Sequence, residues 1–436
     1  MPAPARRHVR LNLFAHAVGH HGAAWRAPGS AVLRLGDITY WEELAQIAER
    51  GRLDAIFLAD GQSIAPAGAE RGPTWFLEPI TVLTALARAT ERIGLVTTVS
   101  STFWDPFHAA RLLASLDHIS HGRAGINVVT SMTDAEARNH GMAALPAHEE
   151  RYATAEEFLR VLHGLWDSWP RESIRADPGG VYVDPSMLRP LEHHGDSFAV
   201  DGPLNVPTPP QGRPVLFQAG ASEPGRDLAA RWAEGIYAVA WDLESAHAYR
   251  TDVRARAAAL GRDPDLIAVM PGLVTYVGST EEEVRRLQAD LHSRLPVEHS
   301  LRQLAFFVGQ DTSGWELDAP VPPLPPLEEF TGPKGRYATV LRIIRTARPT
   351  VRELLGFLAA GGGHATVIGT PETVADEIER WVDAGAADGF NLMPPTLPGG
   401  IEDFVDQVVP VLQERGRFRR EYAGSTLREH LGLPRP

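Results

Sequence analysis

Three stretches of the sequence carry polar side chains where an α/β protein forms a binding site. They are residues 126–131, 148–152 and 218–222. Each is expected at a loop or a helix start after an apolar strand, and parallel α/β folds bind their ligands at the carboxyl ends of the strands. Together the three stretches indicate a site for a large phosphorylated cofactor.

His148 and Tyr152 are four residues apart at the start of a predicted helix, so both side chains can lie on one face. A helix start offers free amides and a partial positive charge, which suit an anionic group. Taken alone, the stretch is more typical of an amphipathic first turn with a capping histidine.

Residues 220–226 follow a predicted strand and open a helix. Gly220 permits close approach of the backbone, Ser222 and the following amides can bind phosphate oxygens, and Arg226 adds charge. The stretch is neither a Walker loop nor a dinucleotide fingerprint, so it indicates only a general phosphate site. Because no Gly-x-Gly-x-x-Gly follows a strand, we expect no NAD(P)H-binding domain in this chain.

Three further candidates lie in or at the ends of apolar strands. Asp60 ends one such strand, where a buried carboxylate needs hydrogen-bond donors; it can equally cap a neighbouring loop. Asn127 is a polar amide in an apolar strand, so a ligand or a neighbouring strand must supply its partners. Thr97 is β-branched and fits a strand without any ligand.

His20 and His21 lie in a loop after the first predicted strand. Adjacent histidines rarely bind one metal ion through both rings, and no Asp or Glu nearby completes a ligand set. We therefore expect no metal site, and we favour acid–base or hydrogen-bond chemistry by one histidine.

Composition excludes several classes of function. The chain of 436 residues has a net charge of −13, which argues against binding a nucleic-acid backbone. It contains no cysteine, so disulfides, thiolate metal sites and a cysteine nucleophile are excluded, and Lys334 is the only lysine. No apolar run is long enough for a signal peptide or a membrane span, and we expect a cytoplasmic enzyme.

Apolar runs alternate with helical patterns along the chain. Strands are predicted at residues 10–17, 53–59, 93–99, 124–129, 215–218, 236–239, 266–277 and 389–392, and helices at 40–50, 80–90, 109–119, 154–166, 225–233, 245–260, 371–384 and 401–415. Eight such units favour a (β/α)₈ barrel over a doubly wound sheet, which usually has fewer strands.

Long insertions interrupt this pattern, at about residues 132–150, 170–213 and 297–352. The last contains the proline-rich run 320–326, which predicts extended surface chain. We interpret the insertions as lids at the C-terminal face of the barrel and as an oligomer contact, within a single domain that spans residues 1–436.

Taken together, these segments resemble the bacterial-luciferase-like flavin monooxygenases, in the branch of the nitrilotriacetate, long-chain alkane and dibenzothiophene sulfone monooxygenases. The resemblance runs from about residue 11 to residue 433. It is carried by residues 19–20, 24–26, 57–60, 127–131, 134–139, 148–152, 165–169, 218–220, 389–391, 403–406 and 408–410.

The resemblance implies a two-component system. The barrel would take reduced FMN from a separate NAD(P)H:flavin reductase, react it with O₂ to a flavin peroxide and oxygenate a small organic substrate. A homo-oligomer is also implied. Two other readings remain: a deazaflavin-dependent hydride transfer on the same barrel, and a flavin-binding protein without turnover.

The resemblance also assigns residues. By matching position, the flavin-contacting residues are Asp60, Thr97, His148, Tyr152 and Ser222, and we add Asn127, Gly220 and Arg226 from their places in the sequence. Ser222, the following amides and Arg226 are expected at the phosphate, with Asp60, Thr97 and Asn127 nearer the ring system. His20 is expected near the reactive face as the catalytic group, with His148 as a second catalytic candidate that hydrogen-bonds to it.

Overall fold

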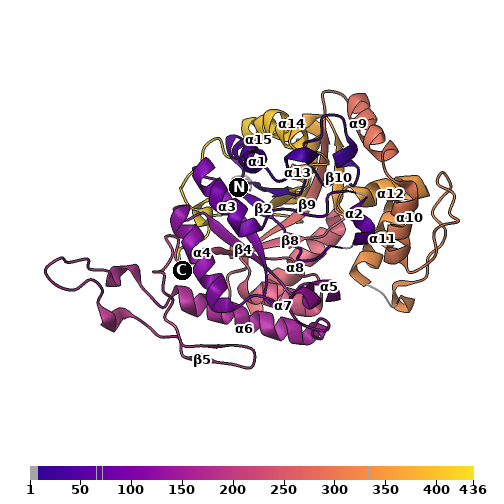
Figure 1. Cartoon of the computed structure of the whole chain (residues 1–436). Coiled ribbons are helices and arrows are strands. Elements are labelled where there is room, and N and C mark those ends of the chain that lie inside the picture. Colours follow the sequence, from indigo (N-terminus) through magenta and orange to yellow (C-terminus); the bar gives the residue numbers. More distant parts are fainter. Residues whose placement is uncertain (1–7, 65, 71, 331–333) are drawn as a thin grey trace.

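Eight parallel strands pair in a closed ring in the computed structural model, which describes residues 8–64, 66–70, 72–330 and 334–436 (Figure 1). The ring runs β11-β1-β2-β3-β4-β7-β8-β9, and β9 closes it by pairing Gly272 with Asn391 of β11. The predicted barrel is therefore confirmed. Its strands are β1 Arg10–Ala15, β2 Ala55–Leu58, β3 Gly94–Ser100, β4 Ala124–Val129, β7 Val215–Gln218, β8 Gly235–Ala238, β9 Ala268–Val277 and β11 Gly389–Leu392.

Helices surround the ring and begin at side-chain caps. Asp37, Glu78 and Asp105 each accept backbone N–H groups at a helix start, and proline follows two of these caps at the first helical position. The outer helices are α1 Ile38–Arg50, α3 Pro79–Ala89, α4 Pro106–Ile119, α6 His148–Trp166, α7 Glu223–Trp232, α8 Leu243–Ala259, α13 Pro371–Asp383, α14 Gly399–Asp403 and α15 Val409–Glu414. Short helices α2 Pro66–Ala69, α5 Asp134–Asn139 and α16 Leu427–His430 complete this part of the fold.

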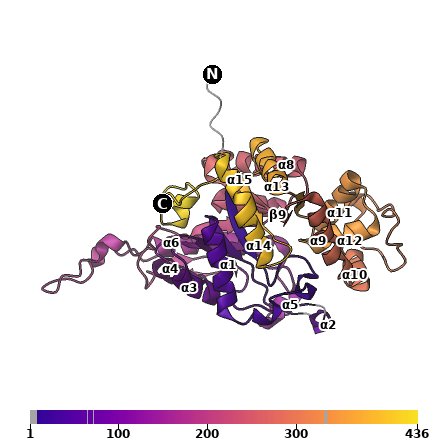
Figure 2. The same ribbon diagram turned by 90° about the horizontal axis from the view of Figure 1, so that it is seen from above.

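The insertion at 170–213 begins and ends at the opposite end of the barrel from the one predicted, and its middle part runs back along α6, where the hydroxyls of Ser197 and Thr154 are 3.2 Å apart. It connects the end of α6 to the start of β7, and Gln211 Nε2 donates to the carbonyl of Ala124, the first residue of β4. It contains the short hairpin β5 His193–His194 and β6 Ala199–Val200 and projects from the body of the molecule (Figures 1 and 2). A connection from a helix to the next strand must start at the amino-terminal face, so the expectation of a C-terminal lid is wrong for this segment.

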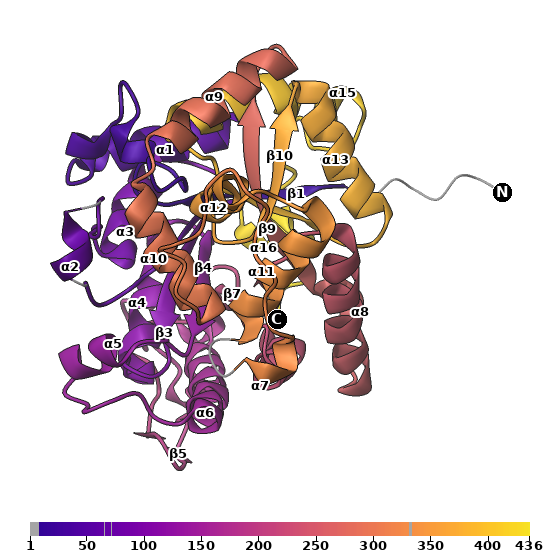
Figure 3. The same cartoon turned by 90° about the vertical axis from the view of Figure 1, so that its right-hand side faces the viewer.

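A second insertion, longer than expected, lies between β9 and β11. It forms four helices, α9 Glu281–Ser293, α10 Val297–Val308, α11 Lys334–Ala347 and α12 Val351–Ala359, which we call the inserted helices. Leu301, Leu304, Val340 and Leu354 belong to an apolar core of their own, beside the ends of β9 and β10 (Figure 3). The proline-rich run 320–326 forms no helix, as predicted; Pro320 makes an isolated antiparallel bridge with Thr350, and residues 321–326 are irregular.

A ninth strand, β10 Ala365–Gly369, was not predicted. It pairs with the second half of β9, from Leu273 with Ala365 to Val277 with Gly369. The ten-residue β9 is therefore shared: its first half closes the barrel and its second half carries β10. The apolar run Ala365–Ile368 was hidden from sequence analysis because it follows directly on a glycine-rich stretch.

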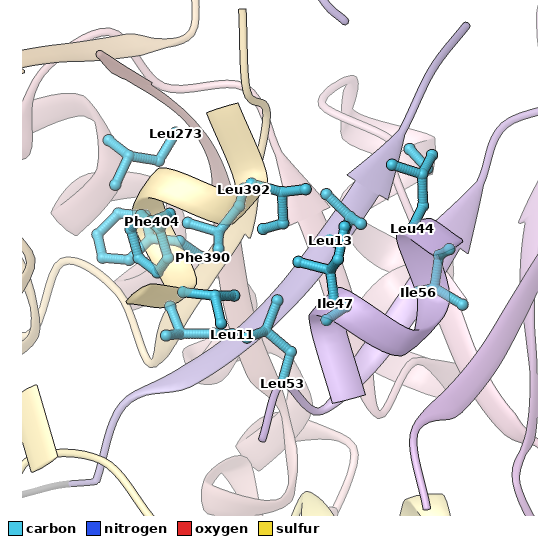
Figure 4. Close-up of a cluster of buried hydrophobic side chains, with 14 of the residues drawn as sticks. Leu11, Leu13, Leu44, Ile47, Leu53, Ile56, Leu273, Phe390, Leu392 and Phe404 are labelled. Atoms are coloured by element: carbon cyan, nitrogen blue, oxygen red, sulfur yellow. The ribbon is translucent and has the colours of Figure 1, made fainter. Parts of the chain in front are cut away.

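Alternation along the strands separates two apolar layers. Leu11 and Leu13 of β1 face the helices, where they pack with Leu44 and Ile47 of α1 (Figure 4). Phe14 faces the interior of the barrel together with other aromatic side chains from β2, β7 and β8. Because side chains alternate between the two faces of a strand, only every second residue of each strand points into the barrel, toward the site.

Two boundaries differ from the prediction in ways that affect the site. Helix α6 begins at His148 and not at residue 154, so the whole stretch 148–152 is helical. Strand β1 ends at Ala15, because the chain turns through a positive φ at Ala17. In the described part of the chain, no helix has the length and apolar character needed to cross a membrane.

Candidate functional site

The loop that carries His20 is held against the end of β11. Gly19 has φ +127°, and a Cβ atom there would collide with the carbonyl oxygen of Pro395. The amides of His20 and His21 donate to the carbonyls of Pro394 and Pro395, at 2.9 and 3.1 Å. Glycine at position 19 thus allows the close approach that fixes the backbone of His20.

His20 is neutral and has a defined tautomer. Its Nε2 lies 2.9 Å from the carbonyl oxygen of Phe14, which can only accept, so Nε2 carries the proton and Nδ1 keeps its lone pair. Burial is the main cause that lowers the pKa of His20 to about 3; the nearby rings of His16 and His364 act in the same direction, and the hydrogen bond to the Phe14 carbonyl acts against it. At neutral pH this side chain offers one hydrogen-bond acceptor, Nδ1.

Asn127 faces the interior of the barrel and is incompletely satisfied. Its Nδ2 donates to Thr98 Oγ1 at 3.1 Å, whereas its Oδ1 is buried and has no partner among the described residues. A buried amide oxygen without a donor indicates a ligand that supplies one. Asn127 therefore fits the expectation that it faces a bound group.

Thr97 is not brought into this site. In β3, Leu95 packs with the helices and Val96 with the barrel interior, so the alternation turns Thr97 outward and Thr98 inward. Thr98 Oγ1 donates to the carbonyl of Leu58 and accepts from Asn127. The threonine at the site is therefore Thr98, one residue from the one expected, and two adjacent threonines could not be separated without the register of the strand.

Asp60 lies at the end of β2, beside a cavity of about 430 Å³. Gln62 Nε2 donates to its carboxylate at 2.8 Å. Burial is the main cause that raises the pKa of Asp60, and the negative charges of Glu78 and Glu136 act in the same direction. Three aromatic side chains, Trp75, Phe76 and Trp104, line the same cavity beside Asp60.

The insertion after β4 covers this cavity. Asn139 of α5 lines it and donates to the carbonyl of Gln62 at 2.7 Å, and His140 contacts the Gln62 amide. The His140 ring also stacks on Phe103, with ring centroids 4.4 Å apart. These contacts hold the loop after β2 and the insertion after β4 together as one wall.

The start of α6 meets the turn after β7. A Cβ atom at Gly220 or Gly225 would lie 3.1 or 3.0 Å from the hydroxyl of Tyr152. The ring of His148 lies against that of Tyr152, with centroids 4.9 Å apart, and His148 itself is exposed. Two stretches some seventy residues apart in sequence, 148–152 and 218–222, are thus neighbours, as the prediction requires.

Ser222 and Arg226 have structural partners at this turn. Ser222 caps α7, where its Oγ accepts the amide of Gly225 at 3.3 Å. Arg226 pairs with Asp252 at 2.9 Å and donates to the carbonyl of Ala221 at 3.0 Å. The turn therefore presents the start of α7 to the barrel mouth, whereas the charge of Arg226 is already shared with a carboxylate.

His20 and His148 are not joined. The hydrogen bond of His20 goes to Phe14, and the ring contact of His148 is with Tyr152. The expected bond between the two histidines is absent from the described residues: His20 lies in the loop after β1, which is bonded to the end of β11, whereas His148 is the first residue of α6 and packs on Tyr152. No group of three His, Cys, Asp or Glu side chains there could hold a metal ion.

Two residues near His20 were missed by sequence analysis. Tyr237 of β8 and His364, just before β10, hydrogen-bond to each other beside Phe14. The signal available for His364 was the run Gly361-Gly362-Gly363 that precedes it. Tyr237 gave no signal, because a tyrosine is ordinary in a strand.

Residues 13–388 match the family described as luciferase-like monooxygenase. N-acetyl-S-(2-succino)cysteine monooxygenase of Bacillus subtilis (strain 168) is 45% identical over 433 residues, which cover 99% of this chain and 98% of that protein. Nitrilotriacetate monooxygenase component A of Aminobacter aminovorans is 42% identical over 445 residues, with coverage of 99% and 98%. A solved riboflavin lyase, with modified FMN and riboflavin, superposes with a TM-score of 0.85 at 32% identity and covers 98% of this chain and 97% of its own.

The chain belongs to the luciferase-like monooxygenase family. Within that family it is a flavin-dependent monooxygenase, which agrees with the resemblance found in the sequence.

Proposed function

We propose that this protein binds reduced FMN delivered by a separate NAD(P)H:flavin reductase and oxygenates a small organic substrate at the carboxyl ends of the barrel strands. The observation that carries the proposal is the contact between Tyr152 and the Gly220–Gly225 turn. It brings a helix start, a capping serine and a tyrosine hydroxyl together at the barrel mouth, on the same side as the unpartnered amide oxygen of Asn127.

The phosphate of FMN is assigned to the turn after β7. The Glu223 amide at the start of α7 and the hydroxyls of Ser222 and Tyr152 are the donors offered there, because Pro224 has no N–H and the Gly225 amide is bound by Ser222. Glycine at positions 220 and 225 lets the turn pack closely against the Tyr152 hydroxyl. Arg226 adds long-range charge only, because Asp252 neutralises part of it. His148 covers this end of the site from the first turn of α6, and we place it with the flavin contacts and not at the reacting centre.

The ring system is assigned to the mouth of the barrel. Asn127 Oδ1 would accept an N–H group of the flavin, and Asp60 and Thr98 border the same space, with Thr98 in the place given to Thr97 by sequence. When bound, reduced FMN would supply the electrons that activate O₂. His20 Nδ1, which is unprotonated at neutral pH, would accept a hydrogen bond at the reacting centre, since the Nε2 proton is held by the Phe14 carbonyl.

The wall formed by residues 60–64 and α5 excludes water from this centre. Its contacts, Asn139 to Gln62 and His140 to Phe103, close the side of the cavity next to Asp60. Exclusion of water is what keeps the activated oxygen for the substrate, and its loss would release H₂O₂ instead.

The relatives narrow the choice of substrate. N-acetyl-S-(2-succino)cysteine and nitrilotriacetate, which their names give as substrates, are both small molecules with several carboxylates and a thioether or amine centre. We propose a carboxylated thioether or amine for this chain. The aromatic lining of the cavity supports the alternative of a more apolar substrate, for which sulfones, alkanes and simple thioethers are the probes.

One assay tests the proposal. The purified protein is combined with a generic flavin reductase, NADH, FMN and each candidate substrate, and mass spectrometry follows the gain of an oxygen atom or the loss of a fragment. We expect product only when reductase and FMN are both present. Rapid NADH oxidation by the protein alone would contradict the two-component arrangement, and turnover with reduced deazaflavin but not with reduced FMN would favour hydride transfer.

The proposal also places this enzyme in the cytoplasm as a homo-oligomer. The name "component A" of the nitrilotriacetate relative supports a separate reductase as the partner, which meets the oxygenase only to transfer flavin. Light scattering coupled to gel filtration measures the oligomeric state, and a single-chain mass would contradict it.

A further inference from the structure

His364 reaches the mouth of the barrel through an unusual stretch of backbone. Gly361, Gly362 and Gly363 all have positive φ, at +141°, +65° and +101°. A Cβ atom on Gly272 of β9 would collide with His364 Nδ1 and would lie 2.6 Å from the sulfur of Met393. The glycine turn and the absence of a side chain at Gly272 thus allow His364 to lie directly against β9, where it is 4% exposed.

Tyr237 is the partner of this histidine. Its hydroxyl lies 3.1 Å from His364 Nε2 and 3.2 Å from the Met393 sulfur, and the two rings stack with centroids 5.3 Å apart at an angle of 13°. The stack and the hydrogen bond together fix both the plane and the tilt of the tyrosine ring. Such a doubly held aromatic ring is a rigid support for its neighbours.

The neighbour is Phe14, which in turn holds His20. The Tyr237 and Phe14 rings meet edge-on at 5.3 Å, and Phe14 contacts the His20 ring at 4.7 Å. The carbonyl of the same Phe14 accepts the Nε2 proton of His20. A continuous series of contacts therefore runs from His364 through Tyr237 and Phe14 to His20.

The inserted helices reach the same loop from the other side. The amide of Gly22 donates to the carbonyl of Ala359, the last residue of α12, at 2.9 Å. His21 stacks on His292 of α9, with centroids 5.4 Å apart at 16°. Since α12 leads within a few residues into the glycine turn and His364, one segment contacts the His20 loop both directly and through Tyr237.

We infer that Tyr237 and His364 are positioning residues for His20, which they hold through Phe14 so that Nδ1 points at the reacting centre. Because the glycine turn follows α12, the position of His364 depends on how the inserted helices pack against the rest of the molecule. The inference rests on the proposed function for the role of Nδ1, whereas the geometry of the His20 ring can be measured without any flavin.

The test compares three substitutions with a matched control. Tyr237→Phe removes only the hydroxyl, His364→Phe keeps a ring but removes the hydrogen bond, and His364→Gln keeps a polar partner for the hydroxyl. Tyr276→Phe is the control, because Tyr276 is a buried tyrosine of β9 whose hydroxyl has no partner among the described residues. Thermal melting shows that each variant is folded.

The first readout is the imidazole NMR signal of His20 in FMN-free protein labelled with ¹⁵N-histidine, assigned by its loss in His20→Gln. We expect the wild type to show the proton on Nε2. In Tyr237→Phe and His364→Phe the His20 signals should shift and broaden, whereas in His364→Gln and Tyr276→Phe they should stay at the wild-type positions.

The second readout is the reoxidation of enzyme-bound FMNH₂ by O₂, followed by stopped-flow absorbance. A misplaced His20 should change this rate about three- to tenfold in Tyr237→Phe and His364→Phe and leave FMN affinity within about twofold. Unchanged His20 signals in both folded variants would overturn the positioning role. A wild type that binds no flavin would overturn the proposed function instead, and the NMR comparison would still decide the positioning role.

Discussion

The two sides of the barrel mouth are built differently. On the β1 side, His20 is fixed by a carbonyl, an aromatic ring and two backbone hydrogen bonds of its loop, and burial keeps it neutral. On the α6 and α7 side, His148 is exposed and the turn at Gly220 packs against the Tyr152 hydroxyl at the start of α7. The first side is built around a buried, fixed imidazole, and the second around a helix start with hydroxyl groups.

The comparison teaches which residue does which task. A hydrogen-bond acceptor at a reacting centre needs a fixed direction and an unprotonated nitrogen, and the β1 side provides both. A phosphate needs hydrogen-bond donors and the positive end of a helix dipole, which the start of α7 provides. Substitutions on the two sides should therefore affect different steps, and the following predictions run from the largest expected effect to the smallest.

His20→Ala should have the largest effect, and it should act on coupling. Loss of Nδ1 should lower product formed per FMNH₂ consumed by about two orders of magnitude, the effect typical of removing one fixed hydrogen-bonding group from a reacting centre, while H₂O₂ rises to match. The measurement is H₂O₂ and product from the same reaction with a substrate that the screen identifies. His148→Gln is the matched substitution on the other side and should change the product formed per FMNH₂ by no more than about twofold. A loss as large as that of His20→Ala would contradict the different roles assigned to the two sides.

Gly220→Ala should act on the other side, through binding. The new methyl group would lie 2.5 Å from Gln218 Nε2, 2.8 Å from the Gly225 Cα and 3.1 Å from the Tyr152 hydroxyl, so the turn assigned to the phosphate would have to shift. We expect the dissociation constant of FMN to rise about tenfold, a cost of about 1.4 kcal/mol, with coupling unchanged. Fluorescence quenching of FMN measures it. Gly314→Ala, where no heavy atom lies within 4 Å, is the control and should bind as the wild type does.

Tyr152→Phe tests the same proposed phosphate contact with a smaller change. The phenylalanine keeps the ring contact with His148 and loses only the hydroxyl at the turn. One neutral hydrogen bond to a phosphate corresponds to about a three- to tenfold weaker binding of FMN. Riboflavin, which has no phosphate, serves as the second ligand: its affinity should not change, and an equal loss for both ligands would place Tyr152 away from the phosphate.

The smallest effect concerns the pH dependence of stability on the β1 side. Burial, with a contribution from His292, lowers the pKa of His21 to about 3, against an ordinary value of 6.5. Below pH 6.5 the unfolded chain therefore takes up a proton that the folded protein takes up only near pH 3, so this histidine makes folding less favourable as the pH falls through that window. His21→Asn, which keeps an acceptor for the amide of Ala23, removes the effect.

Calorimetric melting at pH 7.5, 6, 5 and 4 measures this difference. The wild type should lose more of its melting temperature than His21→Asn does as the pH is lowered. Parallel curves for the two proteins would show that His21 titrates in the folded state as it does in water.

Most of the fold followed from local patterns. Seven of the eight barrel strands were predicted from apolar runs bounded by turn residues, and Gly389–Leu392 followed from its place after a helix. The predictions that failed concern features that depend on neighbouring strands. Strand β10 forms because β9 is long enough to pair along both of its halves, and the outward direction of the Thr97 side chain depends on the register of β3. The face on which residues 170–213 lie also required the direction of the connection.

The sequence by itself determined the repeating βα units, the family, and the polar residues at the strand ends, because periodicity, glycine turns and helix starts are local properties of the chain. Only the tertiary structure decided which of these residues meet. It placed Tyr152 beside Gly220, separated His148 from His20, chose Thr98 over Thr97 and brought His364 to Tyr237. Contacts between segments that are distant in the sequence depend on strand order and register, which no local pattern contains.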